Sequence, residues 1–466
     1  MGKGIKLIIK SWFLLCLVFC FGLSKVYSKD KEYYDFSNYN VILVCFDALQ
    51  ASHTGCLGYF RNTTQTIDEF AASGFLFKQT IAQGSWTVPS VMSLFTSMYP
   101  SEHRVVNKYS TYTENEKVFS DLSKLSPEVE TLAEVLKNSG YVTGGFTGDA
   151  GVSARFGFSK GFDIYIDDQK FAGFDHSIPP AINWLRQNKD KKFFIFLHGY
   201  DSHGQYDPPN GFTRRFVDFD YKGPLKGGKE EQGKFREEGL EKGSIQLTDD
   251  DVRFWRALYD EKINDADQRF RGFIEEMRRL GILDRTIIII TADHGTEFYE
   301  HKRFDHGFSL YDELIHVPLV IYLPGIKGNK VIKEQVRSID LMPTILDLLR
   351  IGIKDKIINQ MRGKSLVPLL KGEHMELAAF SETDYRLYTH KRAIRTTDGW
   401  KFIYSLENNT KQLYNLNKDP QEENNLVDAE QRKAYELEQK LFTWLKSMQT
   451  EISSYNNVKE SMIKEY

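Results

Sequence analysis

The stretch Thr286-Ile-Ile-Ile-Ile-Thr-Ala-Asp293-His294-Gly295 decides the fold class, because it joins an apolar strand directly to two polar side chains. A continuous β-branched run is typical of a parallel strand covered on both faces. In open α/β sheets, ligands bind just outside the carboxyl ends of the strands. The stretch therefore predicts a carboxylate and an imidazole at a functional site. Asp293 alone would also fit a polar turn that caps a helix.

Two further apolar strands are predicted to end at the same edge. The run Asn40 to Phe46 ends at Asp47, and residues 192–198 lead into a polar loop that carries Asp201 and His203. A second strand-end carboxylate favours a shared site over two unrelated turns. Metal ligands are often spaced as Asp201 and His203 are, but exposed loop residues are too, so both interpretations stay open.

Thr87 is predicted to lie at the start of a helix. Pro89 suits a first helical turn, and residues 90–96 carry apolar side chains at helical spacing. Thr87 would fit a plain N-cap. The N-terminus of a helix also stabilises anions, so the Thr87 hydroxyl is also a candidate nucleophile.

A polar cluster follows the isoleucine strand. It consists of Glu297, Glu300, His301, Asp305 and His306. This is more polar than a structural loop requires, and His301 is a candidate catalytic or supporting residue. His198, at the end of an apolar strand, fits a packed histidine instead.

Composition narrows the class of protein. With 466 residues, the chain can form one large domain and a small appendage. The net charge of −3 gives no basic excess for nucleic acid. Only Cys45 and Cys56 lie outside the apolar N-terminal segment, so a disulfide framework or a cysteine metal site is not expected.

The N-terminus resembles an export signal. Three lysines in the first ten residues precede an apolar segment over residues 11–23, and Ser28 supplies a small residue at a cleavage point. We expect residues 1–28 to be a signal peptide and the protein to be secreted or periplasmic. An uncleaved membrane anchor is the alternative.

The rest of the sequence pattern predicts how the chain divides into domains. We predict an α/β catalytic domain over residues 37–374, with a charged surface loop inserted at 210–247. Short alternating segments and a final helix predict a small α+β subdomain over 375–450. A tail follows over 451–466.

Taken in order, these segments resemble the sulfatase family, within the alkaline phosphatase superfamily. The matching segments are Asn40–Asp47, Trp86–Pro100, Thr291–Gly295, His306–Glu313, Val317–Leu319, Ser338–Thr344, Met361–Gly363 and Gln412–Leu426. The resemblance implies an α/β sandwich, with a large, mostly parallel sheet flanked by helices and a metal-dependent site at one end.

The chain departs from the sulfatase pattern at the nucleophile. Sulfatases have Cys or Ser there, within Cys-x-Pro-x-Arg, and mature it to formylglycine, whereas this chain has Thr87, and Val91 in place of the arginine. Ala48 replaces a second carboxylate, and His306 lies where single-metal sulfatases tend to have lysine. A threonine nucleophile with two metals is similar to the phosphodiesterase and phosphotransferase branches.

The resemblance implies two metal sites. The first would take Asp47, Asp293, His294 and the Thr87 oxygen, and the second Asp201, His203 and His306. Such mixed ligands suit zinc or manganese better than calcium or magnesium. Asn107 and Lys108 are predicted to contact the substrate oxyanion.

We therefore predict an exported hydrolase that cleaves phosphate diesters or related esters through a covalent Thr87 intermediate. Its substrate would be a small-molecule, glycan or lipid-linked phosphate or sulfate ester, with membrane contact only if the N-terminal segment is uncleaved. Three alternatives stay open: a sulfate-ester hydrolase without formylglycine, a transferase of envelope phospho-substituents, and a non-catalytic glycan-binding protein.

Overall fold

The computed structural model describes most of the chain. The described residues are 35–106, 124–149, 151–204, 206, 215–217, 220–242, 244–326, 328–385 and 389–448. The predicted signal segment, and also Asn107 and Lys108, lie outside them. Along the described residues, no helix is both long and apolar enough to cross a lipid bilayer.

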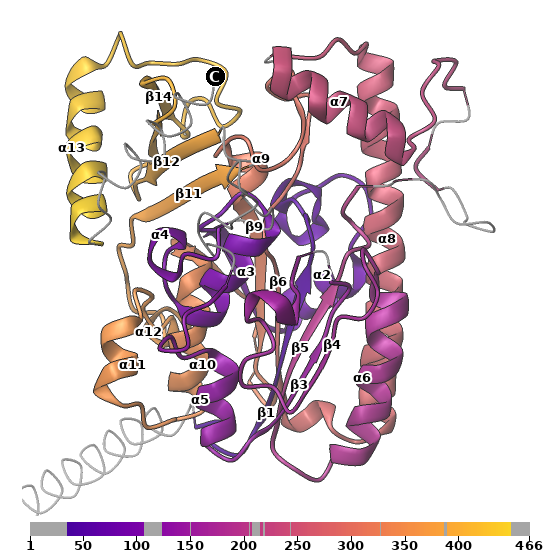
Figure 1. The fold of residues 1–466 in the computed structure, drawn as a ribbon. Helices are drawn as coiled ribbons and strands as arrows, with labels where there is room; N and C mark the ends of the chain where they lie inside the picture. The colour runs from indigo at the N-terminus through magenta and orange to yellow at the C-terminus, as the bar shows by residue number, and fades with distance from the viewer. Residues whose placement is uncertain are drawn as a thin grey trace, which may run out of the picture.

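The larger part of the molecule is built around a central eight-stranded sheet (Figure 1). Seven strands run in one direction, and only β9 is antiparallel to its neighbours. In spatial order the strands are β10 (Lys330–Arg337), β2 (Phe75–Ile81), β9 (His316–Tyr322), β6 (Thr286–Ala292), β1 (Asn40–Phe46), β5 (Phe193–Gly199), β3 (Val142–Phe146) and β4 (Ile164–Ile166).

Helices cover both faces of this sheet because alternate side chains of each strand point to opposite sides. Ile287 and Ile289 of β6 pack in one apolar cluster, whereas Ile288 and Ile290 pack in the other. One face is covered by α3 (Thr87–Thr96), α5 (Leu132–Asn138), α10 (Leu341–Leu348), α11 (Asp355–Gln360) and α12 (Val367–Leu370), and the other by α2 (Gln65–Ser73), α6 (Phe174–Asn188) and α8 (Asp249–Arg279). The predicted strand of isoleucines is therefore fully buried, as its composition indicates.

A smaller antiparallel sheet lies beside one end of the central sheet (Figure 1). Its strands, in order, are β11 (Ala379–Tyr385), β12 (Thr389–Arg395), β13 (Trp400–Ser405) and β14 (Thr410–Asn415). The helix α13 (Gln431–Ser447) packs on one face through Leu437 and Leu441. This confirms the predicted α/β class with a small C-terminal subdomain.

Short elements complete the fold. They are the hairpin β7 (Glu297–Phe298) and β8 (Phe304–Asp305), the helices α4 (Pro100–His103) and α9 (Asp312–Ile315), and the 3-10 turns Ala51–His53, Gly55–Leu57, Ala154–Phe156, Leu283–Arg285 and Ser338–Asp340.

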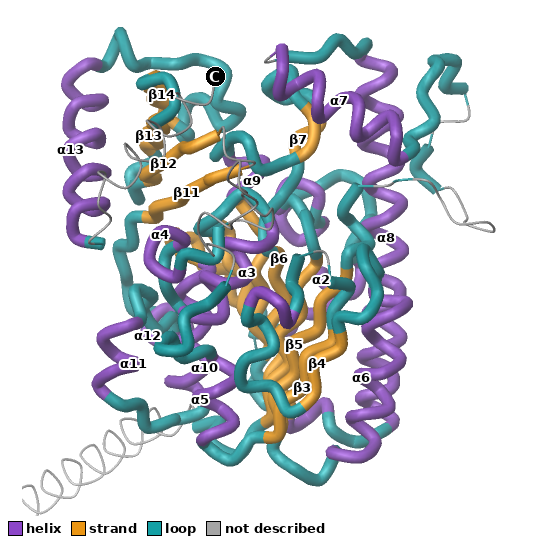
Figure 2. Tube along the Cα trace, in the orientation of Figure 1, coloured by secondary structure: helices purple, strands orange, loops and turns teal. Residues whose placement is uncertain are grey.

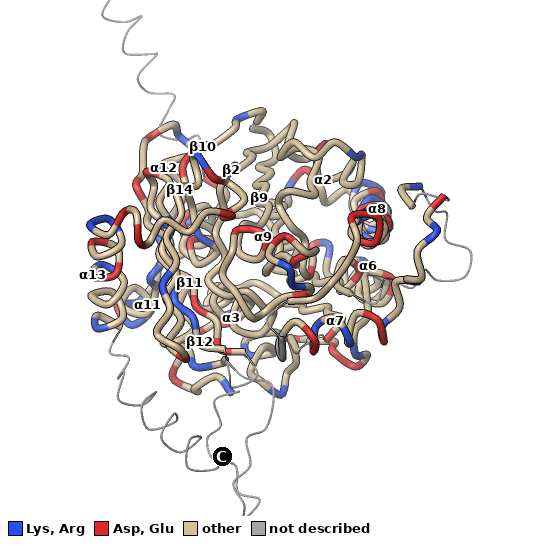
Figure 3. Tube along the Cα trace, turned by 90° about the horizontal axis from the view of Figure 1, so that it is seen from above, with Lys and Arg blue, Asp and Glu red and all other residues tan. Residues whose placement is uncertain are grey.

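The inserted segment 210–247 differs from the prediction of a surface loop, since it contains the helix α7 (Lys229–Lys242) (Figure 2). Its composition explains the difference: Lys, Glu, Gln and Arg are good helix formers, although they give no apolar period. Acidic and basic side chains are interspersed along α7, as along α8 and α13 (Figure 3).

Candidate active site

The site lies where β1 and β6 end. The two strands pair in parallel, with Phe46 beside Ala292, so the next residues, Asp47 and Asp293, leave the sheet at the same edge. Both carboxylates are almost wholly buried, as is His294. One carboxylate oxygen from each of Asp47 and Asp293 and one ring nitrogen of His294 lie within 4.8 Å of one another. The three residues could therefore hold one metal ion.

Backbone groups orient the Asp293 carboxylate. Its Oδ1 accepts hydrogen bonds from the backbone N–H groups of Ala48, at 3.1 Å, and His294, at 2.9 Å. Ala48 reaches this position in the left-handed region, with φ of 58°. In contrast, Oδ2 of Asp293 and Oδ1 of Asp47 are buried with no hydrogen-bond partner among the described residues. Buried charged oxygens without donors are what a cation would satisfy.

Thr87 and His294 face each other. The Nδ1 atom of His294 lies 2.6 Å from the carbonyl oxygen of Gly295, so Nδ1 donates to that oxygen and Nε2 is the nitrogen that faces the site. Oγ1 of Thr87, the first residue of α3, lies 3.2 Å from that Nε2. The N-cap of α3 is Trp86, so the Thr87 hydroxyl does not act as the predicted alternative, an N-cap.

His198 belongs to the same site, contrary to the expectation of a merely packed histidine. It lies on β5, which pairs with β1 on the side opposite β6. Its Nε2 is 3.2 Å from Oδ2 of Asp47, and both side chains are buried. The sequence offered no signal for this contact beyond a histidine at a strand end.

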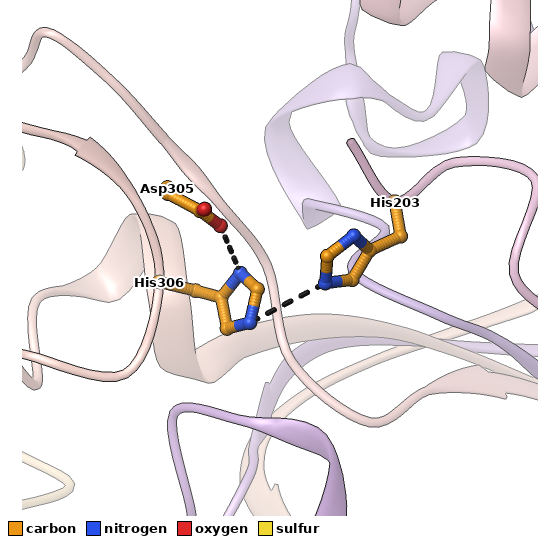
Figure 4. Close-up of side chains that lie close together, drawn as sticks. All are labelled: His203, Asp305 and His306. Carbon is orange, nitrogen blue, oxygen red and sulfur yellow. Dashed lines mark hydrogen bonds and ion pairs between the residues drawn. The ribbon is translucent and has the colours of Figure 1, made fainter. Parts of the chain in front are cut away.

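A second group of ligand-type side chains adjoins the first. It consists of His203, Asp305 and His306, whose ligand atoms also lie within 4.8 Å of one another (Figure 4). Nε2 of His203 is 3.4 Å from Nε2 of His306, and Nδ1 of His306 is 2.5 Å from Oδ1 of Asp305. Two imidazole nitrogens bound to one tetrahedral zinc are about 3.3 Å apart, given Zn–N bonds of ~2.0–2.1 Å. The spacing of the two histidines therefore suits one shared cation.

Asp201 is not part of this second group. Its Oδ2 instead accepts a hydrogen bond of 2.7 Å from the backbone N–H of Phe174, at the start of α6. Its Oδ1 lies 3.8 Å from Nε of Arg269. Asp305 is the carboxylate beside the histidines. It belongs to the polar cluster noted in the sequence, but nothing in that pattern distinguished it from its neighbours.

His301 lies in neither group. It stacks on Tyr311 with ring centroids 3.5 Å apart, and its Nε2 is 2.8 Å from Oε1 of Glu313. Its backbone N–H donates to Glu297. The structure therefore places His301 among carboxylates beside the C-terminal subdomain, and a direct catalytic role for it stays a prediction.

Glu313 gives a testable pH dependence. Burial, with the charge of Glu300, raises its pKa from 4.5 to about 8. Since the folded state binds the proton more tightly, stability should fall as pH rises from the unfolded pKa to about 8. Glu313→Gln should therefore melt at least ~1–2 °C above wild type beyond pH 8, and the difference should shrink at acid pH. Circular dichroism melts would measure it, and a pH-independent difference would contradict the assignment.

Burial and charge set the protonation of the two groups. Burial and the charge of Asp47 raise the pKa of Asp293 to about 6. Burial opposes ionisation of Asp47 too, but contact with His198 and the charges of nearby histidines hold its pKa well below its ordinary value. Burial lowers the pKa of both His203 and His306. Neutral imidazoles and ionised carboxylates are the forms that bind metals.

Family models match most of the chain. The model described as Sulfatase matches residues 39–351. The chain belongs to the sulfatase family. A second model, described as N-sulphoglucosamine sulphohydrolase, C-terminal, matches residues 299–451.

Similar proteins agree with this membership. An arylsulfatase of Clostridium perfringens is 23% identical, covering 84% of this chain and 91% of the relative. A Δ4,5-hexuronate-2-O-sulfatase of Bacteroides thetaiotaomicron is 24% identical, covering 83% and 84%. A solved phosphonate monoester hydrolase of Agrobacterium radiobacter superposes with a TM-score of 0.70 at 20% identity, covering 88% and 96%. Another structure, in complex with its substrate D-glucosamine-2-N,6-O-disulfate, gives 0.69 at 20%, covering 89% and 99%.

This sulfatase-family chain is therefore an ester hydrolase, with the alkaline phosphatase-like fold of the solved sulfatases. Members of the family generally bind a divalent metal ion, and the two ligand groups are candidates to hold one.

Proposed function

We propose that the chain hydrolyses phosphate esters, diesters foremost, through a Thr87 nucleophile and two divalent cations. The observation that carries this proposal is the position of the Thr87 hydroxyl. It lies at the N-terminus of α3 and 3.2 Å from His294, and the second ligand group adjoins through His306, whose ring centroid is 4.5 Å from that of His294.

The residues fit metal ions. Asp47, Asp293, His294 and the Thr87 oxygen would hold one cation, and His203 and His306 would hold the other, with Asp305 orienting His306. The partnerless buried oxygens of Asp47 and Asp293 support the first assignment. Bound there, cations would lower the pKa of the Thr87 hydroxyl and offset charge that develops on the ester.

Thr87 would then act as the nucleophile, and the N-terminus of α3 would stabilise the charge that develops. The Thr87 oxygen would form a bond to phosphorus while the bond from phosphorus to the leaving alcohol breaks, and the proton lost by the Thr87 hydroxyl would end on that alcohol. The positive end of the α3 dipole would stabilise the negative oxygens. Water then cleaves the phospho-threonine and restores Thr87.

A sulfate-ester hydrolase is the second candidate, and the arylsulfatase and hexuronate sulfatase relatives favour it. The formylglycine mechanism does not apply, since Cβ of threonine carries a methyl group and oxidation there gives a ketone. A sulfate monoester and a phosphate diester both carry one negative charge, so charge alone does not separate the two candidates. The second group of ligands, His203, Asp305 and His306, would hold a second cation, and two-cation sites are typical of phosphate-ester hydrolases.

Metal analysis tests the proposal. We expect two equivalents of zinc or manganese in protein purified without chelator, and one equivalent in His306→Ala, together with turnover of bis(4-nitrophenyl) phosphate ahead of 4-nitrophenyl sulfate. A single equivalent in wild type, unchanged in His306→Ala, would overturn the two-metal proposal and move sulfate esters to the front.

We also propose that the protein is exported, with residues 1–28 as its signal. Its substrates would then be extracellular or envelope esters, among them glycan-linked ones. N-terminal sequencing of the protein recovered from a secreting host tests the cleavage.

A further inference from the structure

The inserted helix α7 contacts the loop that carries His203. Gly204 follows His203, and a Cβ placed on Gly204 would lie 1.7 Å from Nε2 of Gln232, on α7. Gln232 is buried. A side chain at position 204 would therefore have to displace the buried end of Gln232.

The same helix contacts the segment that carries His306. Phe235 packs against Phe304 of β8, with ring centroids 5.8 Å apart, and against Trp255 of α8 at the same separation. The next residue, Arg236, places Nη1 at 3.2 Å from Oδ2 of Asp305. One helix thus touches both segments whose histidines face each other.

We propose that α7 builds the second metal site, with Arg236 as its positioning residue. Arg236 holds Asp305, and Asp305 in turn holds His306. This inference rests on the proposed two-metal function and extends it, because it assigns a role to an insertion that neither ligand group includes.

The geometry supports a relay from Arg236 to the metal-facing nitrogen. Asp305 is buried and has φ of 84°, a conformation that its surroundings must hold. Its Oδ2 faces Arg236 while its Oδ1 faces Nδ1 of His306. A carboxylate that accepts the Nδ1 proton keeps Nε2 unprotonated and directs it toward Nε2 of His203.

Arg236→Gln tests the relay. Without the guanidinium, the Asp305 carboxylate loses the charge that fixes its orientation, and loss of such outer partners typically weakens metal binding ~10–100-fold. Titration of the chelator-treated full chain with zinc should show the second equivalent weakened by that factor and the first unchanged. Lys234→Gln is the matched control, because Lys234 is an exposed cation on the same helix. Arg236→Lys, which keeps the charge, should recover part of the affinity.

The outcomes separate the two proposals. If the wild-type chain binds only one equivalent of zinc, the proposed two-metal function itself is wrong. A wild-type chain that binds two, with Arg236→Gln binding both as tightly, would overturn the role of α7 alone. Equal weakening in Lys234→Gln would also overturn it, as a general charge effect. Retention of the first equivalent in Arg236→Gln shows that the variant is folded at the central sheet.

Discussion

Thr87→Ala should abolish ester hydrolysis, with kcat falling by about 10⁴-fold or more, as when other covalent nucleophiles are removed. The variant has no oxygen to bond to phosphorus or sulfur at the start of α3. Asp293 and His294 are held by backbone contacts and Asp47 by His198, none of which involves Thr87, so the other metal ligands should remain. Alanine also suits a helix, so the loss should not come from unfolding.

Thr87→Ser supplies the matched comparison, because it keeps the hydroxyl and removes only a methyl group. It should retain substantial activity, and metal content should be close to wild type in both variants. Rapid quenching of wild type with substrate, followed by mass spectrometry of the peptide containing residue 87, should detect the covalent adduct. Activity of Thr87→Ala within tenfold of wild type would instead indicate direct attack by water.

The strands β1, β5 and β6 were predictable because their apolar runs are long and uninterrupted, as over Thr286–Ala292 and Asn40–Phe46. The start of helix α6 depends on a distant contact that no local sequence pattern shows. It begins at Phe174, where the distant carboxylate of Asp201 accepts a backbone N–H. Helix α7 has no apolar period, and its packing depends on single side chains such as Phe235. Tertiary contacts decide both cases, and no local pattern records them.

The candidate site was predictable where strand ends determine it and less so elsewhere. Asp47 and Asp293 follow paired strands, so the register of the sheet brings them together. Asp201 and Asp305 are both acidic neighbours of a predicted ligand histidine, and only the path of the chain shows that Asp305 faces inward. His198 contacts Asp47 for the same reason, since β5 is the other neighbour of β1.

Lys401→Met should destabilise the docking of the C-terminal subdomain by ~3–5 kcal/mol, because it leaves the buried carboxylate of Glu422 without its cation, although Asp312 keeps Arg395 at 3.2 Å. Lys401 of β13 is fully buried, and its Nζ lies 2.8 Å from Asp312 of α9 and 2.9 Å from Glu422. Methionine keeps the aliphatic length, so the variant isolates the charge. Denaturant unfolding, followed by the fluorescence of Trp400 and Trp444 in the subdomain, would measure the effect.

The deficit of Lys401→Met should also depend on pH. Burial raises the pKa of Glu422 to about 7, although the charge of Lys401 opposes the shift. Without Lys401, protonation of Glu422 relieves one buried charge at low pH and becomes more costly as pH rises, so the deficit should widen above about pH 7. Lys440→Met is the control, because its pair with Glu436 on α13 is exposed and worth only ~0.3–0.5 kcal/mol. Equal effects in the two variants would show that the buried charges of Asp312 and Glu422 do not hold the subdomain in place.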